Sequence, residues 1–127
     1  MVKVLLVGAG GFLGSVLRYL VSGAAQSFAG SPAFPYGTLA VNVVGCFAIG
    51  FLSELAETRG AFGADTRIFL VTGILGGFTT FSAFGNETMN LLRDGEFLLG
   101  GLNVGLQVGL GLIAVWGGYT VAYMLWR

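Results

Sequence analysis

Side chains that could bind or conduct an ion are concentrated in one apolar stretch, GILGGFTTFSAFGNE, at residues 73–87. The stretch combines a glycine pair, three hydroxyl side chains and three phenylalanines, and it ends in the carboxylate of Glu87. Polar or ionisable side chains at membrane depth are unfavourable, so they are candidate functional residues by default. What this set can do depends on whether the chain around it lies in water or in lipid.

Residues 76–80 form a poor helix interior, because Gly costs about 1 kcal/mol relative to Ala and the β-branched Thr79 and Thr80 lose side-chain freedom. One interpretation is a break between two half-helices, whose freed backbone carbonyls can hold a hard cation such as sodium. The other is a continuous helix in which Gly76 and Gly77 serve close packing. Spacing alone does not decide between them.

Phe81 and Phe84 lie three residues apart and therefore share a helix face. One interpretation is that they are core or lipid-facing side chains. The other is that they line an anion path, because the edge of a phenyl ring carries partial positive charge. A small anion that moves along ring edges is attracted weakly and released easily, as conduction requires. Thr80 and Ser82 would add hydroxyls to such a path.

Amides and charges elsewhere extend the set of candidates. Asn42 either donates to an ion or makes an interhelical hydrogen bond, worth about 0.6–2 kcal/mol in membranes. Asn103 and Gln107 are four residues apart on one helix face, for which we favour a water-filled path over a subunit contact. Arg18 either snorkels to the membrane interface or concentrates anions at a pore mouth. Glu87 either pairs with Arg18 or caps a pore.

The elements that must position these residues are membrane helices. Of the 127 residues, 55% are hydrophobic and 9% charged, whereas a soluble domain carries roughly 25% charged residues. No charged residue occurs in 19–53, 68–86 or 97–126, and a spanning helix needs about 20 apolar residues. We predict an all-α integral membrane protein, a single four-helix domain over 1–127, with helices at about 3–25, 37–56, 67–92 and 97–126.

Several function classes are excluded. The net charge of +0 gives no electrostatic case for a nucleic-acid partner. The opening MVKVLLVGAGGFLG fails as a nucleotide-binding fingerprint, because Leu13 stands where the third glycine belongs. The chain has no histidine and one cysteine, Cys46, so an internal disulfide or a cysteine metal cluster is excluded.

We interpret the small-residue spacing, which includes Gly10 with Gly14 and Gly73 with Gly77, as helix packing. The same interpretation covers a third set on the last helix: Gly101, Gly105 and Gly109.

Orientation in the membrane is encoded weakly. Four helices place both termini and the loop 57–66 on one side, and the positive-inside rule counts Lys and Arg on each side. Four basic residues lie on that side and two on the other, which biases the orientation only slightly, so individual copies could insert either way. The four are Lys3, Arg59, Arg67 and Arg127, and the two are Arg93 and Arg18. Four short helices leave little room for a wide pore in one subunit, which suggests an oligomer.

Three segments, GGFLGSVLRYL, PYGTLAVNVVG and TGILGGFTTFSAF, occur in an order and form that resemble the Fluc (CrcB) family of bacterial fluoride channels. The resemblance covers nearly the whole chain, although the last helix matches only in length and character. It implies a passive, non-enzymatic, fluoride-specific channel of the bacterial inner membrane that exports fluoride from the cytoplasm. It also implies an antiparallel, dual-topology homodimer with a broken third helix and two narrow pores.

The resemblance assigns roles by motif position. Backbone carbonyls of Gly76 and Thr79 would hold a structural sodium ion that is not transported. Where the family often has FSTFS this chain has FSAFG, so Ala83 and Gly85 lack two hydroxyls. The roles of Asn103 and Gln107 are inferred from position alone. The expected pore residues are Asn42, Phe81 and Phe84, with Thr80, Ser82, Arg18 and Glu87 along the path.

Two rival hypotheses remain. A small multidrug antiporter also has four short helices, but it needs a carboxylate in its first helix, and the first acid of this chain is Glu54. A structural module that only packs against a larger complex suits the glycine-rich faces equally well. It does not explain the polar residues of the third helix.

Overall fold

The computed structural model describes residues 1–126, and every regular element in that range is a helix. Four helical spans are long and apolar enough to cross a membrane: Val2–Ala29, Tyr36–Glu57, Ala64–Arg93 and Phe97–Leu125. The predicted all-α architecture with four spans is therefore confirmed. The elements in chain order are α1 (Val2–Ala29), α2 (Tyr36–Arg59), α3 (Ala64–Arg67), the π-helix η1 (Ile68–Leu75), α4 (Gly76–Phe78), α5 (Phe81–Arg93) and α6 (Phe97–Leu125).

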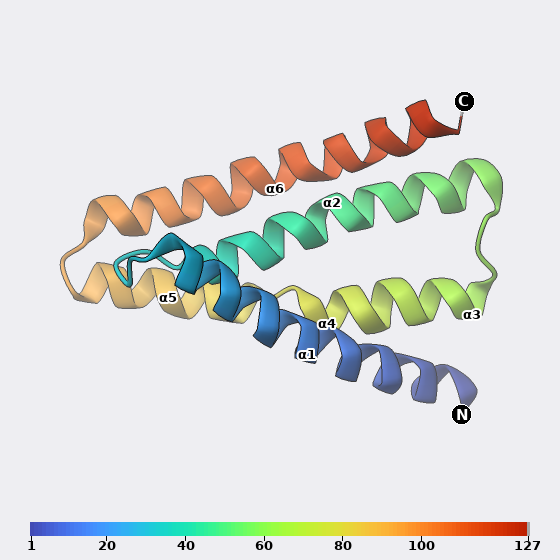
Figure 1. The fold of residues 1–127 in the computed structure, drawn as a ribbon, viewed down its shortest axis with the longest axis horizontal. Coiled ribbons are helices and arrows are strands. Elements are labelled where there is room, and N and C mark those ends of the chain that lie inside the picture. The colour runs from blue at the N-terminus through green and yellow to red at the C-terminus, as the bar shows by residue number, and fades with distance from the viewer. Residues whose placement is uncertain (127) are drawn as a thin grey trace.

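The spans lie side by side in an elongated bundle (Figure 1). α6 packs along α2, and α1 packs along η1 and α4 of the third span. α1 and α2 end at Gly30 and Gly60, whose positive φ angles of 66° and 55° are accessible to glycine without strain. The N-terminus, the α2–α3 loop and the C-terminal end of α6 lie at one end of the bundle, as predicted (Figure 1). Arg127, used in the prediction of orientation, is outside the described residues.

Glycines bring α1 against the third span, as their spacing predicts. A Cβ atom on Gly10 would lie 2.6 Å from the carbonyl oxygen of Phe69 and 2.8 Å from the Cα of Gly73. A Cβ on Gly14 would collide with the carbonyl of Ile74, and one on Gly77 would lie 2.6 Å from the carbonyl oxygen of Gly11. These contacts are backbone to backbone, so they cannot be relieved by moving a side chain.

The glycine face predicted to pack on α6 makes no packing contact within one copy of the chain. A Cβ on Gly101, Gly105 or Gly109 would meet no atom within 4 Å, so this glycine face is open within the described chain. α6 instead buries the face that carries Gly100, Asn103, Gly111, Gly118 and Ala122. Small-residue spacing shows where a close approach is possible, but it does not name the partner.

The third span changes conformation along its length. Its first half contains the π-helical residues of η1, and α4 continues it through Gly76 and Gly77, which are helical. Thr79 and Thr80 then adopt extended backbone angles, with φ −85°, ψ 160° and φ −153°, ψ 110°. α5 begins at Phe81, and the Thr80 hydroxyl caps it by accepting from the N–H of Ala83 at 3.2 Å.

Candidate functional site

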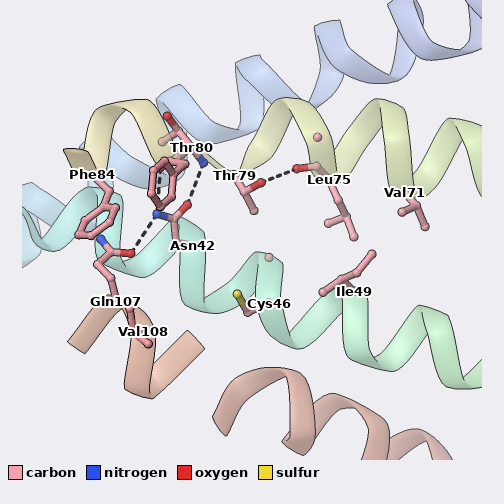
Figure 2. Close-up of a pocket in the computed structure, with 13 residues that line it drawn as sticks. Asn42, Cys46, Ile49, Val71, Leu75, Thr79, Thr80, Phe84, Gln107 and Val108 are labelled. Carbon is pink, nitrogen blue, oxygen red and sulfur yellow. Dashed lines mark hydrogen bonds between the residues drawn. The ribbon is translucent and has the colours of Figure 1, made fainter. Parts of the chain in front are cut away.

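Asn42 on α2 binds the extended residues of the third span (Figure 2). The N–H of Thr80 donates to Asn42 Oδ1 at 2.8 Å, and Asn42 Nδ2 donates to the carbonyl oxygen of Thr80 at 3.1 Å. Asn42 Nδ2 also donates to Gln107 Oε1 at 3.0 Å, which links α2 to α6. Nearby on α2, a Cβ on Gly45 would collide with the Thr79 methyl group, so glycine permits this close approach.

A pocket of about 410 Å³, here called the aromatic pocket, surrounds this junction (Figure 2). The rings of Phe81 and Phe84 have centroids 5.3 Å apart and planes at 71°, so they meet edge to face. Phe81 is 82% exposed, which leaves one side of the pocket uncovered by this chain. The predicted residues that line the pocket are Gly76, Thr79, Asn42, Thr80, Phe81, Phe84 and Gln107.

A second pocket, of about 680 Å³ and here called the hydroxyl pocket, shares Thr80 with the first. Glu87 lies in it, and Glu87 Oε1 accepts a 2.6 Å hydrogen bond from the hydroxyl of Thr38, which is 6% exposed. Within the described chain no ion pair joins Glu87 to Arg18, so that alternative is not observed. The polar residues that line the pocket are Ser15, Arg18, Ser22, Thr38, Thr80, Ser82 and Glu87.

The carbonyls expected to bind sodium have both lost their helical donors. In an α-helix the carbonyl of Gly76 would accept from the N–H of Thr80, but that N–H donates to Asn42. The carbonyl of Thr79 would accept from the N–H of Ala83, which donates to the Thr80 hydroxyl. Arg18 Nη1 donates to the Thr79 carbonyl at 3.4 Å. Carbonyls freed in this way are suitable ligands for a hard cation.

Asn103 lies apart from both pockets. It is 0% exposed, and its Nδ2 donates to the hydroxyl of Thr88 at 2.9 Å. That hydroxyl in turn donates to the carbonyl oxygen of Phe84 at 2.8 Å. Asn103 therefore braces α5 near Phe84 from α6, and its place on an ion path stays a prediction.

The sequence analysis did not identify Ser15 or Ser22, and it considered Thr38 only as one of the polar residues at membrane depth, without a role on the path; all three line the hydroxyl pocket. Ser15, Arg18 and Ser22 are spaced by three and four residues, which places them on one face of α1. That periodicity could have found the two serines. Thr38 is a polar residue four positions before Asn42 on α2, and the same spacing argument applies to it.

Comparisons with known proteins identify the family of the chain. Residues 5–119 match the family model described as "CrcB-like protein, Camphor Resistance (CrcB)". Proteins named fluoride-specific ion channel FluC include one from Rhizobium etli, 49% identical over 121 residues, which cover 95% of this chain and 96% of that protein. The Rhizobium meliloti protein is 51% identical over 118 residues, which cover 93% of this chain and 94% of that protein. The Geobacter sulfurreducens protein is 46% identical over 125 residues, which cover 98% of this chain and 100% of that protein. This four-span chain therefore belongs to the CrcB family of membrane proteins.

Proposed function

We propose that the chain is a fluoride-specific channel of the bacterial inner membrane that lets fluoride leave the cytoplasm passively. Relatives that match it over nearly its whole length are named fluoride-specific ion channels, and so the family is one of channels and not of enzymes. The observation that carries the proposal to this chain is the aromatic pocket. It gathers two phenyl rings, two amide side chains and two threonine hydroxyls, without a fixed positive charge among its lining residues.

The chemistry of fluoride suits such a pocket. Fluoride is small and strongly hydrated, so a path must replace its water with good hydrogen-bond donors. A permanent positive charge would hold the ion too tightly, whereas uncharged donors and ring edges bind it weakly enough to release it. Fluoride that enters as neutral HF ionises in the cytoplasm, and a passive channel then lets the anion leave down its electrochemical gradient.

The path we propose connects the two pockets through Thr80, which lines both. Arg18 and the hydroxyls of the hydroxyl pocket would raise the local fluoride concentration and exchange its first waters. Ser82, Thr80 and then the rings of Phe81 and Phe84 would pass the ion onward. Glu87, held by Thr38, would limit the access of anions from one side.

We propose that the working unit is an antiparallel homodimer. One side of the aromatic pocket is open and Phe81 is largely exposed, so one copy of the chain does not enclose a path. A second copy inserted in the opposite orientation would cover the pocket, and the weak charge bias of the loops is compatible with both orientations. The interruption at Thr79 and Thr80 is then the functional break of the third helix.

The carbonyls of Gly76 and Thr79 would hold a structural sodium ion at the centre of that dimer. Their lost helical donors support this role: the Thr79 carbonyl keeps only a 3.4 Å hydrogen bond from Arg18, a carbonyl short of donors at membrane depth is unfavourable, and a cation compensates it. When bound, the ion would supply positive charge that fixes the two extended residues of each copy. The ion is not transported in this proposal.

Fluoride efflux from proteoliposomes tests the proposal. Liposomes loaded with potassium fluoride and given valinomycin should release fluoride to a selective electrode much faster than protein-free liposomes. Release that requires valinomycin shows passive, electrogenic flow of the anion. No release above protein-free liposomes would remove the channel, and electrically silent release coupled to protons would favour a transporter.

A further inference from the structure

One face of α1 follows the third span as far as its break, and α1 packs on α4 there (Figure 1). Gly10 meets the backbone of Phe69, and Gly14, one turn later, meets the backbone of Ile74. Arg18 follows four residues after Gly14 on the same face, at the level where the helical part of the third span ends. The close backbone packing of α1 therefore brings the Arg18 side chain to the break.

At the break, the guanidinium of Arg18 holds a backbone carbonyl. Arg18 Nη1 donates to the carbonyl oxygen of Thr79 at 3.4 Å, which is longer than the usual range of about 2.7–3.2 Å for such hydrogen bonds. A guanidinium has five N–H donors, and this is the one hydrogen bond that Arg18 makes within residues 1–126. The guanidinium is therefore held loosely at the break.

The same carbonyl is one of the two that we propose as sodium ligands. Its helical donor, the N–H of Ala83, donates to the Thr80 hydroxyl instead. A cation on the Thr79 oxygen would lie close to the Arg18 guanidinium, and like charges repel more strongly away from bulk water than within it. Binding of a cation there and the hydrogen bond from Arg18 therefore oppose each other.

The hydroxyl pocket offers the guanidinium a second position. Arg18 lines this pocket, and the hydroxyl oxygens of Ser22 and Ser82, which also line it, can accept from N–H donors that leave Thr79. The carboxyl group of Glu87 lies in the same pocket, and its Oε2 has no hydrogen-bond partner within the described chain. The arginine thus has acceptors on both sides, the carbonyl at the break and the oxygens of the pocket.

We propose that Arg18 competes with sodium for the Thr79 carbonyl, and that its guanidinium turns into the hydroxyl pocket when the cation site is filled. The inference rests on the proposed function, because it links the sodium ligands to the anion entrance. Without sodium the guanidinium supports the break from α1. With sodium its charge faces the pocket and attracts anions. Because such coupling is reciprocal, removing Arg18 must strengthen the binding of sodium.

Sodium titrations of thermal stability test the competition. The unfolding midpoint of the purified protein in detergent is measured as sodium chloride replaces N-methylglucamine chloride at constant ionic strength. The sodium concentration that raises the midpoint by a fixed increment is proportional to the dissociation constant. Arg18→Met should need at least about five-fold less sodium than wild type, since two unit charges roughly 4 Å apart repel to that extent even in water.

Arg93→Met is the matched control for the loss of one positive charge. Arg93 lies in the last turn of α5 and lines neither pocket, so this variant should need as much sodium as wild type. Arg18→Lys keeps the charge beside the break, and its sodium requirement should therefore stay closer to that of wild type than to that of Arg18→Met.

Nitrogen-15 magnetic resonance of the arginine side chains tests the movement of the guanidinium. The chain has five arginines, and the signals missing from Arg18→Met and Arg93→Met assign the two that are compared. The guanidinium hydrogens of Arg18 should exchange with water faster in sodium chloride than in N-methylglucamine chloride, because a hydrogen bond protects them only while it lasts. Arg93 should exchange at the same rate in both salts. If Arg18→Met does not fold, Arg18→Lys assigns the Arg18 signals in its place.

Two results would overturn the competition. One is a sodium requirement of Arg18→Met that equals or exceeds that of Arg93→Met, and the other is an Arg18 exchange rate that is the same in both salts. If sodium raised none of the midpoints, the proposed sodium site would fail and the competition with it. The measurements contain no fluoride, so they are separate from the test of the channel. A protein that releases no fluoride from liposomes would overturn the proposed function, whereas a lower sodium requirement of Arg18→Met in that protein would still support the competition.

Discussion

Asn42 and Thr80 are joined by two hydrogen bonds across two spans, 2.8 Å from the Thr80 N–H to Asn42 Oδ1 and 3.1 Å from Asn42 Nδ2 to the Thr80 carbonyl. The Asn42 side chain thus takes the place of the helical partners that Thr80 would have in a continuous helix. Hydrogen bonds from α2 therefore stabilise the extended backbone of the third span. The weak helix propensity of the surrounding residues also disfavours a continuous helix there.

Replacing Asn42 by leucine should therefore destabilise the third span. The Thr80 N–H and carbonyl would lose their partners inside the bundle, and each unmatched group costs about 1–3 kcal/mol. Thermal unfolding of the purified protein in detergent, followed by tryptophan fluorescence, should show a lower midpoint. Asn90→Leu is the matched control, because Asn90 is an exposed residue of α5 and should tolerate the change. Equal midpoints for the two variants would contradict the bracing role of Asn42.

The spans could be predicted from the sequence because their signal is strong and local. Charge-free runs long enough to cross a bilayer indicate four helices, and the observed bounds extend them by only a few residues at most ends. The polar residues of the third span also stand out, because hydroxyls and an acid are unusual in an apolar run. Their pairing was less predictable, since Asn42 and Thr80 are 38 positions apart.

Details that depend on a tertiary partner were beyond the sequence. The predicted break covered residues 76–80, and within that range Gly76 and Gly77 are helical while Thr79 and Thr80 are extended, because Asn42 supplies replacement hydrogen bonds to Thr80. The π-helical turn of η1 was not predicted either. It lies where the backbone of Phe69 meets Gly10 of α1, a contact that no local propensity encodes.

Adding one methyl group to Gly10 should separate α1 from the third span. The new Cβ of Gly10→Ala would lie 2.6 Å from the Phe69 carbonyl oxygen, and such overpacking costs about 1–3 kcal/mol. Gly8→Ala, two residues earlier, meets nothing within 4 Å, and it should be neutral or stabilising by about 0.5–1 kcal/mol because alanine favours the helix. Thermal unfolding of both variants in detergent checks the difference. If Gly10→Ala were as stable as Gly8→Ala, the close approach at Gly10 would be refuted.

Removing sodium should destabilise the protein if the carbonyls of Gly76 and Thr79 bind it. A ligand that binds only the folded state stabilises it in proportion to the logarithm of its concentration, by about 2.7 kcal/mol at one hundred times its dissociation constant. The unfolding midpoint should rise with sodium chloride and stay constant with N-methylglucamine chloride at equal ionic strength. Side-chain variants cannot remove these ligands, because they are backbone atoms. Identical midpoints in the two salts would argue against a bound sodium ion.

The rings of Phe81 and Phe84 should matter for flux more than for assembly. Leucine at either position keeps an apolar side chain and removes the ring edge, and an edge contact of about 0.5–1.5 kcal/mol corresponds to roughly two- to ten-fold slower fluoride efflux. Phe28→Leu is the control, because Phe28 lies on α1 outside both pockets and is 95% exposed. Size-exclusion chromatography of all three variants should match wild type, because leucine keeps an apolar side chain at each position. If both pocket variants conducted normally, the rings would be packing groups and the ion would take another route.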